Sequence, residues 1–116
     1  MKGNYMLCAI AAACLMMASA VIAEAHYRDL SRFEKLYDEF LMPGTDLSLA
    51  SCQICHINVG QLNLYGRALR RAKKAGIEPE MEAYLDIEDE DSDYDGTSNG
   101  EEIRLGTRPG DANSRP

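Results

Sequence analysis

The sequence predicts a small all-α domain of three helices with an irregular acidic tail. Three segments of the 116-residue chain have apolar residues at helical spacing, and no alternating pattern of useful length indicates a β-strand. Residues 88–116 are acidic, glycine-rich and poor in apolar side chains, so only Ile103 and Leu105 are expected to be buried there. A domain this small usually needs a metal, a disulfide or a cofactor to stabilise its core.

The N-terminal segment, residues 1–23, has the pattern of a signal peptide. A basic residue precedes an uncharged apolar run over Met6–Ala20, and small residues suit cleavage after Ala23 or Ala25. We therefore expect export to the periplasm or to the outside of the cell, where unmodified thiols oxidise. An uncleaved membrane anchor and a lipidation site at Cys14 are the alternatives, and membrane attachment is expected only in those cases.

The first helix is predicted from His26 to Met42. Its apolar residues recur at steps of three and four, and charged residues occupy the other faces. The apolar positions are Tyr27, Leu30, Phe33, Tyr37, Phe40 and Leu41. Pro43 and Gly44 are expected to end this helix. Residues 45–51 then form a polar connection.

The second and third helices are predicted over Asn63–Ala75 and Pro79–Ile87. Between the first helix and the second, residues 57–61 look irregular because Gly60 would break a helix. Gly76 is placed to end the second helix, and Pro79 suits the first turn of the third. The predicted buried face of the second helix consists of Tyr65, Ala68, Leu69 and Ala72.

The segment Cys52-Gln53-Ile54-Cys55-His56 has the Cys-x-x-Cys-His spacing at which c-type haem is attached. Two thiols three residues apart on a turn can each add to one haem vinyl group. The next side chain, the imidazole of His56, then reaches the iron from the same side. Because we expect the three helices to offer no bulky side chain, such as Trp, to fill the space between them, the porphyrin is expected to supply the missing core.

Other uses of the cysteines are less well supported by the sequence. A zinc site would have to draw on Cys52, Cys55, His56 and His26. Two of these are sequence neighbours, which cannot easily converge on one ion. A redox dithiol needs a βαβ context that is absent, and a disulfide between Cys52 and Cys55 would close too short a loop to stabilise much. The conventional candidates for the sixth iron ligand are Met81, His26 and Met42, with an open position or a Lys ligand as alternatives.

The acidic segment Asp91–Glu102 fits the twelve-residue calcium loop, with Gly96 at its sharp turn. The predicted ligands are Asp91, Asp93, Asp95, Thr97, Asn99 and Glu102. Nine acids and no base lie between Asp86 and Glu102, so their repulsion would keep the segment open without a cation. The alternative is a solvated acidic tail that binds nothing specific.

The stretches "SCQICHINVGQLNLYGRAL" and "DEDSDYDGTSNGEEIRLGTRPGD" resemble small exported bacterial c-type cytochromes that pair one haem motif with a calcium-loop tail. The tail is similar to thrombospondin type 3 or EF-hand-like loops. The resemblance spans about residues 26–111. It implies a cytochrome c-like haem domain over residues 24–87, packed around covalent haem, and a calcium-loop tail over residues 88–116. It also implies electron transfer in the cell envelope or outside the cell, not enzymatic catalysis.

The expected function is therefore that of a monohaem electron carrier with redox partner proteins and a structural calcium ion. The net charge of −7 argues against nucleic acid as a partner. A basic stripe on the second helix contains Arg67, Arg70, Arg71, Lys73 and Lys74, and it is expected first of all to be the solvated face of an amphipathic helix. The alternative is a docking surface for an acidic partner or for the acidic tail of a second copy. The alternative functions are a calcium-dependent adhesion or assembly module with structural haem, and a haem enzyme or gas sensor with an open iron site.

Overall fold

The structure is a computed structural model, and it describes residues 27–77 and 80–116. The chain divides into two compact units, Met1–Ser31 and Arg32–Pro116. In the first unit, the described residues 27–31 are helical. The predicted signal peptide and its cleavage positions lie outside the described residues. Over the two described ranges, no helix has the length and apolar character needed to cross a membrane.

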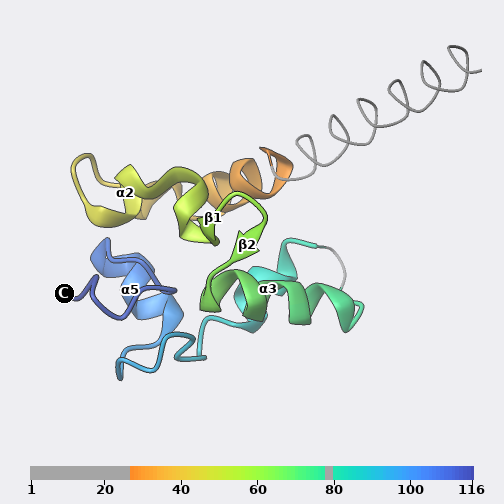
Figure 1. The fold of residues 1–116 in the computed structure, drawn as a ribbon. Helices are drawn as coiled ribbons and strands as arrows, with labels where there is room; N and C mark the ends of the chain where they lie inside the picture. Colours follow the sequence, from red (N-terminus) through yellow and green to blue (C-terminus); the bar gives the residue numbers. More distant parts are fainter. Residues whose placement is uncertain (1–26, 78–79) are drawn as a thin grey trace, which may run out of the picture. The chain divides into compact units, whose positions relative to one another are not determined.

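The second unit is mostly helical, as predicted, and it also contains a short β-hairpin (Figure 1). It begins with helical residues 32–36. The elements that follow are η1 (Asp38–Phe40), α2 (Asp46–Ala50), η2 (Ser51–Ile54), β1 (His56–Asn58), β2 (Gln61–Leu62), α3 (Leu64–Lys74), α4 (Glu82–Asp86) and α5 (Asn99–Leu105). The cysteine motif and the acidic loop therefore belong to the same compact unit.

The first helix is shorter than the predicted range of His26–Met42. Its helical backbone ends at residue 36, and the 3-10 helix η1 follows after Tyr37. The side chain of Tyr37 is buried, and its hydroxyl donates a hydrogen bond to Glu88 Oε1 at 2.9 Å. This contact joins positions 51 apart in the sequence. The spacing of apolar residues within one segment does not reveal such a distant contact. The prediction from that spacing therefore extended the helix beyond its observed end.

Residues 45–51, predicted to be a polar connection, contain the helix α2. Thr45 caps its N-terminus, because the hydroxyl oxygen accepts a hydrogen bond from the amide of Ser48 at 3.2 Å. Leu47 is fully buried, and its amide donates to the carbonyl of Gly106 at 2.9 Å. A helix of five residues is not stable alone, so tertiary contacts of this kind must hold it.

The helix predicted over Asn63–Ala75 is confirmed as α3. Asn63 is its N-cap and Ala75 its C-cap, and Gly76 follows with a left-handed φ of 79°. The predicted apolar face is buried at all four positions, which are Tyr65, Ala68, Leu69 and Ala72. The cap, the apolar stripe and the terminal glycine are all local signals, which is why the sequence was sufficient here.

Two shorter elements differ from their predictions. Residues 57–61, expected to be irregular, take part in the antiparallel hairpin of β1 and β2, in which Gly60 has a φ of 85°. The third helix, predicted from Pro79, is represented by α4, which begins at Glu82. Pro79 itself lies outside the described residues.

Aromatic side chains form the centre of the second unit. The ring centroid of Phe33 lies 4.8 Å from that of Tyr37, 6.2 Å from that of Tyr65 and 6.4 Å from that of Tyr84. All four side chains are buried. The expectation that the helices lack bulky residues for their centre is therefore wrong, and this unit has an aromatic core of its own.

The tail, residues 88–116, is not irregular throughout, because it contains α5. Ser98 caps this helix, and Gly106 ends it in the left-handed conformation at φ 78°. Ile103 is buried as predicted, but Leu105 is 49% exposed. The last turn of α5 therefore contributes one apolar side chain to the core and leaves the other in solvent.

The segment after α5 returns to the N-terminal side of the unit. The hydroxyl of Ser114 is buried and donates to Asp46 Oδ2 at 2.8 Å, while the amide of Arg108 donates to the same hydroxyl at 3.0 Å. A Cβ atom at Gly110 would lie only 2.7 Å from the side chain of Asn63. The tail thus packs closely against both α2 and the start of α3.

Candidate functional site

The Cys-x-x-Cys-His motif forms a tight turn between η2 and β1. Cys52 belongs to η2, and the amide of Cys55 donates to its carbonyl at 3.3 Å. His56 opens β1, where it pairs with Leu62 of β2. Cys52 is exposed, and Cys55 and His56 are half-buried. The structure therefore brings both thiols and the imidazole to one short surface turn.

Several large apolar side chains near this turn are exposed. They are Leu49, Ile57, Val59 and Leu64. They come from α2, from the hairpin and from the first position of α3. Exposed large apolar side chains can belong to a binding surface. Two thiols and an imidazole on one turn are the donors that a covalent haem requires, so this donor set fits that group.

The candidates for the sixth iron ligand lie in different parts of the sequence and differ in their exposure to solvent. Met42 is 50% exposed in the turn before α2. Met81 is half-buried at the N-cap of α4. His26 lies outside the described residues. The identity of this ligand stays a prediction.

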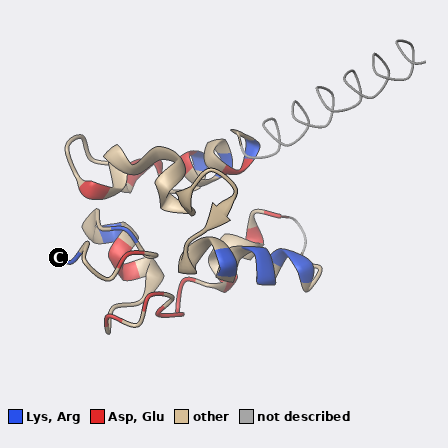
Figure 2. Cartoon of the chain, viewed as in Figure 1, with Lys and Arg blue, Asp and Glu red and all other residues tan. Residues whose placement is uncertain are grey.

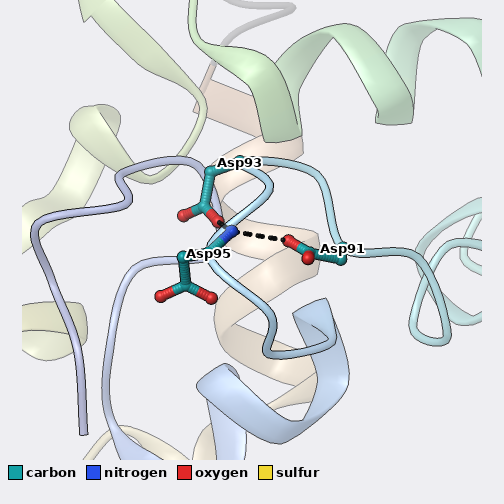
Figure 3. A group of neighbouring side chains, drawn as sticks. All are labelled: Asp91, Asp93 and Asp95. Atoms are coloured by element: carbon teal, nitrogen blue, oxygen red, sulfur yellow. Dashed lines mark hydrogen bonds between the residues drawn. The ribbon is translucent and has the colours of Figure 1, made fainter.

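The three aspartates of the acidic loop lie together. One carboxylate oxygen from each of Asp91, Asp93 and Asp95 lies within 4.8 Å of the other two. The amide of Asp95 donates to Oδ1 of both Asp91 and Asp93 at 3.2 Å (Figure 3). The amides of Gly96 and Thr97 donate to Asp91 Oδ2 and Asp95 Oδ1, each at 2.9 Å. The backbone of the loop is thus folded so that the carboxylates of Asp91, Asp93 and Asp95 lie close together. These are three of the residues that the sequence predicted as calcium ligands.

Two carboxylates of this loop are buried with an oxygen that has no hydrogen-bond partner among the described residues. Glu102 is 0% exposed and its Oε2 lacks a partner, and Asp93 is 7% exposed and its Oδ2 lacks one. Burial raises the pKa of Glu102 to about 8, and the charges of Asp93 and Asp95 add to this effect. Burial also raises the pKa of Asp93. Because such groups are costly to bury alone, this donor set fits a bound cation with hard oxygen ligands.

Asn99, predicted as a calcium ligand, has another role in the structure. It is fully buried, and its Oδ1 accepts a hydrogen bond from the amide of Ser92 at 3.2 Å. Its Nδ2 donates to the carbonyl of Ile87 at 2.7 Å and to Ser92 Oγ at 2.9 Å. Asn99 therefore ties the two ends of the loop together. Coordination by its side chain or by the carbonyl of Thr97 stays a prediction.

Asn63 is a residue that the sequence reasoning did not assign to the site. Its Nδ2 donates to the carbonyls of Gln53 at 3.1 Å and Ile54 at 2.9 Å, and its amide donates to the carbonyl of Cys55 at 2.9 Å. Its Oδ1 accepts from the amide of Gly66 at 2.8 Å. An Asn before a helical apolar pattern predicts an N-cap, but nothing in the local pattern reveals the contacts with the cysteine turn.

The basic stripe lies along α3, which contains no acidic residue, and the acidic residues are spread over several other helices and loops (Figure 2). Arg71 forms an ion pair with Glu90 at 2.5 Å, and Lys73 Nζ lies 5.5 Å from the centroid of the Tyr84 ring. The other three basic residues are exposed and form no ion pair with the described part of the chain; they are Arg67, Arg70 and Lys74. This face of α3 presents three cations to solvent.

Comparison with protein-family models, with curated proteins and with solved structures finds no match to this chain. The chemistry of the site therefore rests on its own residues.

Proposed function

We propose that this protein is a monohaem c-type cytochrome that carries single electrons, with a structural calcium ion in its acidic loop. The observation that supports the proposal most directly is the surface turn that holds Cys52, Cys55 and His56 beside exposed apolar side chains. Cys52 and Cys55 would hold haem through thioether bonds, and His56 would be an axial ligand. When bound, the haem iron supplies a one-electron couple.

The charges of α3 suit a docking role in this function. Arg67, Arg70 and Lys74 are exposed on the helix that follows the cysteine turn. Cations on one surface attract an acidic partner and speed its association, with a strong dependence on salt. We therefore propose that an acidic redox protein docks on this face. No residue of the chain is proposed to act as a catalytic acid, base or nucleophile.

The proposed haem is tested by maturation of the full chain in a bacterial host that attaches c-type haem in the periplasm. We expect the mass of the product to rise by that of one haem, and the pyridine hemochrome spectrum to be that of a thioether-linked group. The double variant Cys52→Ala/Cys55→Ala should lose both signals. As a matched control, Gln53→Ala, which changes the exposed side chain between the two cysteines, should keep them.

Three outcomes separate the possible functions. A wild-type product without porphyrin would refute the proposal. Reversible reduction with a low-spin spectrum would support electron transfer. Haem that is attached but not reversibly reduced, together with partner binding that is lost on calcium removal, would favour the adhesion module instead.

The proposed calcium site is tested by a Glu102→Gln variant. Since this carboxylate is buried and is expected to supply two of the six to eight oxygens around the ion, its loss should weaken calcium binding about tenfold or more. Isothermal titration calorimetry with calcium measures the change. Glu101→Gln is the matched control, because it makes the same charge change at the neighbouring exposed position. Equal weakening in both variants would show that only the overall charge matters.

A further inference from the structure

We infer that Asn63 is a positioning residue for haem attachment, because it holds the cysteine turn in the conformation that presents both thiols. The inference rests on the proposed function. It assigns a task to a residue that lies outside both the Cys-x-x-Cys-His motif and the acidic loop.

Asn63 makes several hydrogen bonds to the cysteine turn. Three successive carbonyls of the motif, those of Gln53, Ile54 and Cys55, all accept from this one residue. Carbonyls at the C-terminal end of a short helix have no partner within the helix, so the chain must supply donors from elsewhere. Asn63 supplies two from its side-chain amide and one from its backbone. These bonds fix the backbone of the two residues between the cysteines and of the second cysteine itself.

The chain packs closely on both sides of the contact between Asn63 and the cysteine turn. A Cβ atom at Gly66 would lie 2.2 Å from the carbonyl oxygen of Cys55. On the other side, a Cβ at Gly110 would lie 2.7 Å from Cγ and Oδ1 of Asn63. Asn63 itself is 7% exposed. The side chain of Asn63 is therefore buried at the start of α3, and the C-terminal segment packs closely against it.

Covalent attachment of haem requires that the cysteine turn hold its two thiols in suitable positions. Each thiol of Cys52 and Cys55 adds across a vinyl double bond: a carbon–sulfur bond forms, the π bond breaks and the thiol proton ends on the neighbouring carbon. No net oxidation or reduction occurs, but both thiols must be correctly placed together with the imidazole of His56. A turn that is already ordered avoids the entropy cost of this placement.

The experiment compares Asn63→Asp with wild type in the same haem-attaching host. Aspartate keeps an oxygen that can cap α3 through Gly66, but it removes the two amide donors to Gln53 and Ile54. Losing two hydrogen bonds should lower the fraction of chain that carries covalent haem about tenfold. Helix content by circular dichroism should stay near that of wild type. Asn58→Asp is the matched control: it makes the same change in the nearby hairpin, at an exposed bond to Gln61, and it should attach haem normally.

A second variant, Gly110→Ala, disturbs Asn63 from the tail without altering the amide itself. Gly110→Ala should also lower the fraction of chain that carries covalent haem. Equal haem fractions and equal reduction potentials in wild type, Asn63→Asp and Gly110→Ala would overturn the inference. Failure of both variants to fold would overturn it as well, since Asn63 would then support the whole unit rather than the turn. Absence of haem in wild type would instead refute the proposed function.

Discussion

A Gly66→Ala variant is expected to be much less stable than the wild-type protein. The added Cβ would lie 2.2 Å from the carbonyl oxygen of Cys55 and 3.0 Å from Cδ2 of Leu62. The carbonyl cannot easily move, because it accepts the amide hydrogen of Asn63 at 2.9 Å. Overpacking of a core commonly costs about 1–3 kcal/mol and sometimes more, and here the obstacle is backbone, so we expect a loss of about 3 kcal/mol or more. Such a loss is a large part of the stability of a small domain.

Urea unfolding followed by circular dichroism measures this effect. Gly76→Ala is the matched control, because no atom lies within 4 Å of the added Cβ and only the left-handed backbone, at φ 79°, opposes the change. That variant should lose about 1 kcal/mol and still fold. Similar unfolding midpoints for the two variants would show that α3 does not pack against the cysteine turn as described.

Without calcium, the protein should become less stable as pH rises from about 4.5 to about 8. The folded protein raises the pKa of Glu102 from 4.5 to about 8 through burial and the charges of Asp93 and Asp95. In this interval the folded state binds more protons than the unfolded state, so the free energy of unfolding falls with rising pH. Because a tenfold change in proton affinity corresponds to about 1.4 kcal/mol, the loss is at most about 5 kcal/mol. The stability that the protonated carboxyl contributes is fully present only below the lower pKa.

Bound calcium should reverse this trend, because the ion requires the ionised carboxylate and its binding releases the proton. The measurement is the urea midpoint across the pH interval, in buffer stripped of calcium by chelating resin and again with excess calcium. Glu102→Gln should flatten the calcium-free pH dependence, and the exposed Glu101→Gln should leave it unchanged. If the urea midpoint of Glu102→Gln still falls with rising pH in the absence of calcium, the pH dependence comes from other groups, such as Asp93.

The sequence predicted well where the structure depends on neighbouring residues. The helix α3 combines an Asn cap, a regular apolar stripe and a terminal glycine, all within a few positions. The three aspartates lie together because alternate positions of one tight loop supply them. Spacing along the chain was enough in both cases. The buried face of α3 and the convergence of Asp91, Asp93 and Asp95 therefore could be anticipated.

Prediction failed where residues far apart in the chain decide the local structure. The first helix stops early beside Tyr37, whose hydroxyl contacts Glu88. The helix α2 depends on Leu47, whose amide is bonded to Gly106. Asn63 looks like an ordinary helix cap until its bonds to the cysteine turn are seen. Apolar periodicity describes one segment at a time, so it contains none of these pairings.

The hydrogen bond between Ser114 and Asp46 has a consequence for the timing of folding. It joins positions 68 apart, so Ser114 leaves the ribosome long after Asp46 has been synthesised. The growing chain can form α3 early, from local signals, but α2 must wait for its distant partner. A nascent chain that stops before Ser114 therefore lacks this contact with α2.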